Sequence, residues 1–119
     1  MSQPIQPIVE RRAGDRVPAS IRVDLVYDAN GEPADGSALI VDVSISGARL
    51  VTDVSDHLTI GTYIGMDSGA GRAIGIVRRC ERGFISGKAF YGVQFVEFDD
   101  RFRGLLFATI SDGLRGSTK

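Results

Sequence analysis

Residues 39–51 have the sequence LIVDVSISGARLV, in which two apolar runs flank a short polar interruption. The β-branched and aliphatic residues on both sides favour extended backbone. The interruption, Asp42-x-Ser44-x-x-Gly47, predicts a corner between two strands, with Gly47 at a positive φ where the chain turns. Because Asp42 and Ser44 are two residues apart, a strand would present both side chains on one face. This stretch alone favours a structural interpretation, in which these side chains bond backbone amides of the turn.

A second polar motif, RRAGDR, occupies residues 11–16 and precedes a strand pattern. It contains the spacing Arg12-x-x-x-Arg16, with Arg11 directly before it. In this order, with a predicted strand and turn between them, the two motifs resemble the signature of the PilZ domain family. The resemblance extends from about Arg11 to the last helical segment, which is most of the chain.

The resemblance implies a receptor for cyclic di-GMP that has a six-stranded antiparallel β-barrel and a C-terminal helix. The ligand-binding residues that it implies are Arg12, Arg16, Asp42, Ser44 and Gly47. An arginine fork matches guanine O6 and N7, or phosphate oxygens, with two parallel donors. Asp42 would accept hydrogen bonds from guanine, Ser44 would donate to phosphate or base, and Gly47 would leave room for a base. Arg11 adds a cation that suits an intercalated ligand dimer; alternatively it is solvated or pairs with Glu10.

Alternating apolar residues predict an all-β body, and fifteen glycines spread between short apolar runs indicate many turns. Residues 1–9 are expected to form a flexible N-terminal arm, and residues 10–116 a single PilZ domain, with a loop before the first strand. A turn or longer loop is expected at 28–37 around Asn30-Gly31, and a tight turn at 67–71. The predicted strands are 21–27, 38–43, 48–52, 62–66, 73–80 and 89–96.

The periodicity changes after Asp100, where apolar residues recur at three- and four-residue steps and predict a helix from Arg101. Asp99 or Asp100 is the expected N-cap, and Gly113 or Gly116 the expected stop. Six strands and one helix predict a closed or nearly closed barrel, since closure removes exposed edges.

The composition restricts the class of protein. The net charge of −1 argues against general affinity for nucleic acid polymers, so a positive site must be local. The single cysteine, Cys80, excludes an internal disulfide, fits a reducing compartment and is expected to be a small packed side chain. No apolar run is long enough for membrane insertion, and the first residues lack the pattern of a signal peptide, so a cytoplasmic location is expected.

A catalytic role is not expected. His57 is the sole histidine and has no evident nucleophile partner, and one histidine with one cysteine does not make a usual metal site. No cofactor is expected besides the ligand. Binding would order the arginine loop and signal to an effector protein, and the family suggests control of motility, adhesion or exopolysaccharide. The alternatives are a nucleotide-independent PilZ-like adaptor and an oligonucleotide-binding barrel.

Overall fold

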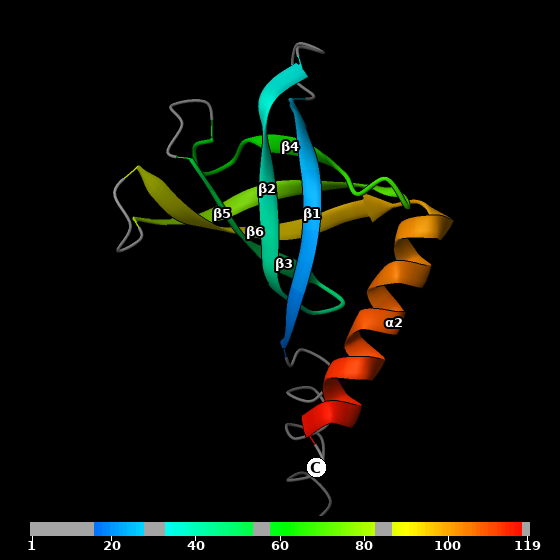
Figure 1. Ribbon diagram of the computed structural model, residues 1–119. Coiled ribbons are helices and arrows are strands. Elements are labelled where there is room, and N and C mark those ends of the chain that lie inside the picture. Colours follow the sequence, from blue (N-terminus) through cyan, green and yellow to red (C-terminus); the bar gives the residue numbers. More distant parts are fainter. Residues whose placement is uncertain (1–15, 28–32, 54–57, 83–86, 118–119) are drawn as a thin grey trace, which may run out of the picture.

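The structure, a computed structural model, describes residues 16–27, 33–53, 58–82 and 87–117 (Figure 1). Several expectations lie outside the described residues. They concern the N-terminal arm at 1–9, Arg11 and Arg12, the Asn30-Gly31 turn, and His57.

Six antiparallel strands form a closed barrel, which confirms the predicted fold class. Each strand pairs with two neighbours in the circular order β1-β2-β3-β6-β5-β4. Closure leaves no strand of the barrel with an unpaired edge. The strands are β1 (Val17–Tyr27), β2 (Pro33–Val43), β3 (Gly47–Asp53), β4 (Tyr63–Asp67), β5 (Arg72–Arg82) and β6 (Lys88–Phe98).

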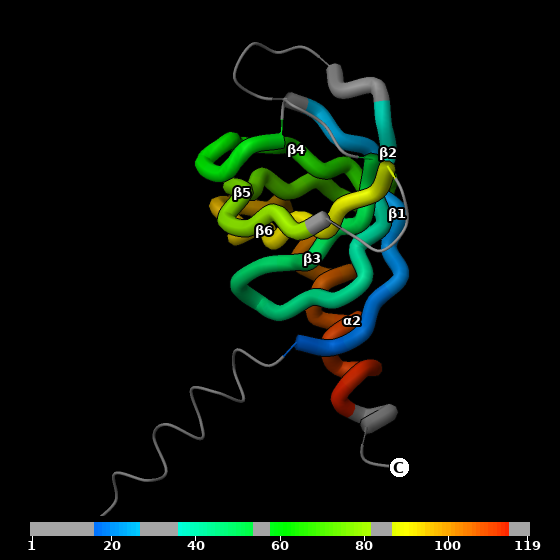
Figure 2. Tube along the Cα trace, turned by 90° about the vertical axis from the view of Figure 1, so that its left-hand side faces the viewer, coloured from blue at the N-terminus to red at the C-terminus, as the bar shows by residue number. Residues whose placement is uncertain are grey.

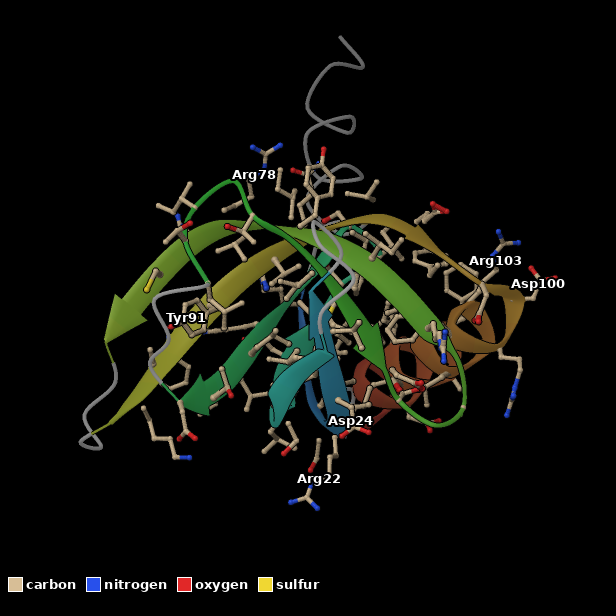
Figure 3. All side chains as sticks on the ribbon, turned by 90° about the horizontal axis from the view of Figure 1, so that it is seen from above. Arg22, Asp24, Arg78, Tyr91, Asp100 and Arg103 are labelled. Carbon is tan, nitrogen blue, oxygen red and sulfur yellow. The ribbon has the colours of Figure 1, made fainter. Side chains whose placement is uncertain are left out.

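The strands bury alternate side chains in the barrel interior. On β1, Val23 and Leu25 are buried, whereas Arg22 and Asp24 are exposed and project away from the barrel (Figure 3). Tyr91 on β6 lies inside and is fully buried. The alternation that predicted half-buried strands is therefore confirmed, and it separates an apolar core from a polar outer face.

Two strands begin earlier than the sequence predicts. β1 starts at Val17 rather than Ile21, and β2 at Pro33 instead of after Ser37. Pro18 pairs with Asp42, next to a register shift between Pro18 and Ile21. An irregular ladder tolerates proline, which cannot donate a hydrogen bond.

The expectation that Cys80 is a packed side chain is wrong, because Cys80 is exposed. A register shift lies between Val77 and Arg79 in the pairing of β5 with β6. Beyond Val77, the residues from Arg78 to Glu81 are all exposed. Unbroken alternation from Val77 would itself have placed Cys80 on the outer face, and after the bulge Cys80 pairs with Tyr91 near the end of β5, where its side chain is exposed.

The helix α2 (Asp100–Ser117) begins at the predicted N-cap. The Oδ1 atom of Asp99 accepts a hydrogen bond from the Phe102 N–H at 2.8 Å, which is the bond of a helix N-cap. The second carboxylate oxygen, Oδ2, accepts from the Arg72 N–H at 3.1 Å. A single carboxylate thus ties the start of the helix to the β4–β5 hairpin, whose tight turn at 67–71 is confirmed.

Of the two predicted stops, Gly113 is wrong and Gly116 lies one residue before the observed end of α2 at Ser117. A Cβ on Gly113 would lie 2.5 Å from the Cβ of Val17, so this glycine lets the helix pack closely on the start of β1. Figures 1 and 2 both place the C-terminal half of α2 beside that end of β1. Among the helices described, none is long and apolar enough to cross a membrane.

Candidate functional site

The two sequence motifs meet in space. Nη1 of Arg16, directly before β1, donates a hydrogen bond to Oδ1 of Asp42 at 2.8 Å and forms an ion pair with it. The side chains are 49% and 23% exposed, respectively. Pairing of Pro18 with Asp42 brings the end of β2 alongside the start of β1, which explains the contact. Arg16 therefore reaches the side of the barrel that carries Asp42.

Ser44 differs from its expected position. β2 ends at Val43, so the alternation of a strand does not extend to Ser44, which lies in the corner and is only 2% exposed. Its Oγ accepts a hydrogen bond from the Ser46 N–H at 3.2 Å and lies 3.1 Å from Oγ of Ser46. Ser44 does not stand beside Asp42 as an exposed hydroxyl; its contacts are those of the structural interpretation.

Gly47 is required for close packing rather than for an unusual φ. It does not have a positive φ, contrary to the expectation from the corner. A Cβ at this position would fall inside 3.0 Å of the Val93 carbonyl oxygen and 3.3 Å from its carbonyl carbon. The space beside Gly47 is therefore filled by the backbone of β6, and a base cannot enter it from this direction.

A row of polar residues crosses the outer face of the barrel from Asp42. Asp42 on β2 pairs with Arg49 on β3, Arg49 with Gly92 on β6, and Gly92 with Arg79 on β5. A small pocket of about 120 Å³ lies along this row. We call it the arginine groove; its lining consists of Arg16, Asp42, Arg49, Arg79, Glu81 and Gly92.

The side chains of the arginine groove are held in place by their neighbours. The guanidinium carbon of Arg49 lies 4.3 Å from the centre of the Phe90 ring, in a cation–π contact. A Cβ on Gly92 would lie 3.2 Å from the Cβ of Arg79, so Gly92 provides the floor over which Arg79 lies. With three arginines and two acids, the lining carries a formal charge of +1 on a chain whose total is −1.

Sequence reasoning missed Arg49, Arg79, Glu81 and Gly92, because the strand register alone brings them beside Asp42. One signal was present: Arg49 occupies the second position after Gly47, within the stretch that decides the fold. The groove is smaller than the roughly 300–1,000 Å³ of sites that enclose drug-sized ligands. The described residues thus supply one wall, suited to an anionic or planar group, while Arg11 and Arg12 lie outside them.

Comparison with protein-family models matches residues 10–111 to the PilZ domain. A search of curated proteins found no match to the chain. The matched segment contains both motifs and extends from before β1 into α2. PilZ domains are in general non-enzymatic domains that bind cyclic di-GMP. The chain therefore belongs to the PilZ domain family.

Proposed function

We propose that this protein is a cyclic di-GMP receptor without catalytic activity that binds the nucleotide against the arginine groove. The supporting observation is the 2.8 Å contact between Arg16 and Asp42, which joins the two motifs on one side of the barrel. The residues proposed to contact the ligand are Arg11, Arg12, Arg16 and Asp42, while Ser44 and Gly47 contribute to the site indirectly.

The Arg16–Asp42 contact supports a role in ligand recognition by orienting the guanidinium. A guanidinium has five N–H donors, and among the described residues Asp42 engages Nη1 only. The donors that no described residue engages can bind phosphate oxygens or guanine O6 and N7. The pair itself is exposed, so its contribution to folding is at most about 1 kcal/mol, and its value lies in positioning.

Arg49 and Arg79 extend this binding surface beyond the two motifs. Guanidinium groups stack on planar rings, and Arg49 already lies over Phe90 in this way. A guanine lying along the row would contact Arg49 or Arg79 while its phosphate faces Arg16. Arg11 and Arg12 would close over the ligand from the other side, and the charge at Arg11 favours an intercalated ligand dimer.

Ser44 and Gly47 have indirect roles in this proposal. The buried Ser44 hydroxyl and the close approach of Gly47 to β6 hold the corner that carries Asp42. Closure of the arginine segment over the ligand would then change the surface presented to an effector protein. The outputs that the family suggests are motility, adhesion or exopolysaccharide control in a bacterial cytoplasm.

Isothermal titration calorimetry of the full chain with cyclic di-GMP tests the proposal. The titration is repeated with GTP and with a short single-stranded oligonucleotide for comparison. Arg16→Ala should weaken binding by about 10- to 100-fold, because charge-assisted hydrogen bonds are worth about 1.5–3 kcal/mol. Arg22→Ala is the matched control, since Arg22 projects outward from β1 and does not line the arginine groove (Figure 3). Its affinity should equal that of the wild type.

The outcomes of the titration distinguish the receptor from the two alternative functions. Absence of binding to cyclic di-GMP by the folded wild type would refute the receptor and favour the nucleotide-independent adaptor. Preference for the oligonucleotide would favour the oligonucleotide-binding barrel. A stoichiometry of one would exclude the intercalated dimer, and equal losses in Arg16→Ala and Arg22→Ala would refute the role of Arg16.

A further inference from the structure

A second and larger pocket lies on another part of the barrel surface. It has a volume of about 420 Å³ and shares no lining residue with the arginine groove. Its position follows the cross-strand row in which Val26 on β1, Gly65 on β4, Ile74 on β5 and Glu97 on β6 are successive partners. The volume falls within the range of about 300–1,000 Å³ that is usual for binding sites.

The floor of this pocket is apolar and held in a fixed shape. The ring of Phe98, one of its lining residues, packs edge-to-face on Phe95 with centroids 5.7 Å apart, and lies 6.0 Å from Phe102 of α2. Gly65 contributes no side chain, which deepens the hollow, and Val26 is 41% exposed at its edge. An apolar side chain can therefore enter a preformed site without rearrangement of the barrel.

The rim of the pocket is acidic. Its lining holds Asp67, Glu97 and Asp99 against one cation, Arg72, for a formal charge of −2. Arg72 is engaged by Asp67 at 3.1 Å, and the Gly69 N–H and Arg72 together lower the pKa of Asp67. Among the described residues, the Asp99 carboxylate accepts hydrogen bonds from two backbone N–H groups, those of Arg72 and Phe102. Within the described residues Glu97 has no ion-pair partner, so the surplus negative charge resides on Glu97 and Asp99.

The surroundings of the pocket suit a protein segment better than a small molecule. Val96, beside Glu97 on β6, is 52% exposed, and Tyr63 on β4 is also exposed. Exposed apolar residues that continue past the rim of a pocket are typical of protein interaction surfaces. A partner segment would place one apolar side chain in the pocket and adjacent residues on this surface.

We propose that this pocket, termed the acidic pocket and lined by Val26, Gly65, Ile74, Glu97 and Phe98 among others, is a docking site for a partner protein. The recognised segment is a short one in which an apolar anchor residue is flanked by lysine or arginine. The anchor fills the apolar floor, and the flanking cations face Glu97 and Asp99. The inference goes beyond nucleotide binding and does not depend on it, because the two pockets have no residue in common.

Synthetic peptides and the ¹⁵N-labelled full chain test this docking site by NMR. One probe peptide has a Leu-Phe centre between lysine pairs, a second has glutamates in place of the lysines, and a third keeps the lysines around a Ser-Gly centre. The lysine Leu-Phe peptide should produce saturable shifts of the amide signals of Gly65, Ile74 and Glu97. Equal binding of the glutamate peptide, shifts confined to the arginine groove, or no saturable shifts would overturn the proposal.

Two variants locate the peptide on the protein. Ile74→Arg should reduce the affinity for the lysine peptide at least tenfold, and Glu97→Gln about two- to fivefold, as for loss of one exposed charge pair. Asp53→Asn removes one negative charge from an exposed position outside the acidic pocket and should leave the affinity unchanged. Far-UV circular dichroism verifies that each variant is folded. If Glu97→Gln and Asp53→Asn have the same effect, the attraction is due to net charge and the acidic pocket is not the site.

Cyclic di-GMP titration of Ile74→Arg should match the wild type, which separates this test from the receptor proposal.

Discussion

Replacing Gly47 by alanine tests whether the second motif depends on a close approach between strands. Gly47 is buried on β3 opposite Gln94 of β6, and a Cβ there would fall inside 3.0 Å of the Val93 carbonyl oxygen. The obstacle is backbone rather than the end of a flexible side chain. β3 and β6 must therefore move apart for alanine to fit.

The expected magnitude follows from what this separation disturbs. Overpacking of a buried site costs about 1–3 kcal/mol. Two backbone hydrogen bonds of the corner, from Ser44 N–H to the Gly47 carbonyl and from Phe95 N–H to the Ser46 carbonyl, are each 2.8 Å long. Weakening them forfeits part of about 0.5–1.5 kcal/mol each. Gly47→Ala should therefore lower the free energy of unfolding by about 2–4 kcal/mol, a large share of the roughly 5–15 kcal/mol of a small domain.

Urea denaturation followed by far-UV circular dichroism or tyrosine fluorescence measures this change, since the chain has three tyrosines and no tryptophan. Gly36→Ala is the matched control, because Gly36 lies on β2, has no positive φ, and a Cβ there would meet nothing within 4 Å. It should change the free energy of unfolding by less than about 0.5 kcal/mol. Equal stability of the two variants would refute close packing as the reason for Gly47.

Two further predictions concern α2 and the β4–β5 hairpin. Gly113→Ala should lower the free energy of unfolding by about 1 kcal/mol in urea denaturation, because its collision with β1 outweighs the gain in helix propensity. Gly104→Ala, in open space on the same helix, should raise the free energy of unfolding by about 0.5–1 kcal/mol. A change of the same sign in both variants would contradict the close contact of Gly113 with β1. The Gly69 N–H and Arg72 lower the pKa of Asp67 below its ordinary value of 3.8, so the stability that Asp67 contributes is present above pH 3.8 and lost as the pH falls through the lowered pKa. The difference in free energy of unfolding between the wild type and Asp67→Asn should close over that range, and a difference that persists below it would contradict the ionic origin.

Much of the barrel follows from local pattern. The alternation on β1 and the change of period after Asp100 predict the strands and the helix, because each depends on neighbouring residues only. For β2 the prediction was too short, because residues 33–37 have the composition of a turn and were assigned to the loop. Pairing with β1, which includes Ser37 opposite Asp24, overrides that local preference.

The glycines and the arginines show where local reasoning stops. A sequence indicates that a glycine is special but does not distinguish a positive φ from a close approach. The reasons for Gly47 and Gly113 are Val93 and Val17, which are remote along the chain. The site was predicted as far as Arg16 meeting Asp42. Arg49 and Arg79 could not be assigned to it without the register of four strands.

The contacts at the two ends of α2 have a mechanical consequence. At its first turn, the Asp99 carboxylate clamps the helix to the hairpin, and Phe102 is buried against the barrel. Near its last turn, the glycine at 113 rests on Val17, which directly follows Arg16 in the chain. The helix is thus held at both ends, and its carboxyl end packs on the residue next to the guanidinium. A displacement of Val17 would be transmitted to the carboxyl half of α2, while the contacts of Asp99 hold the amino end in place.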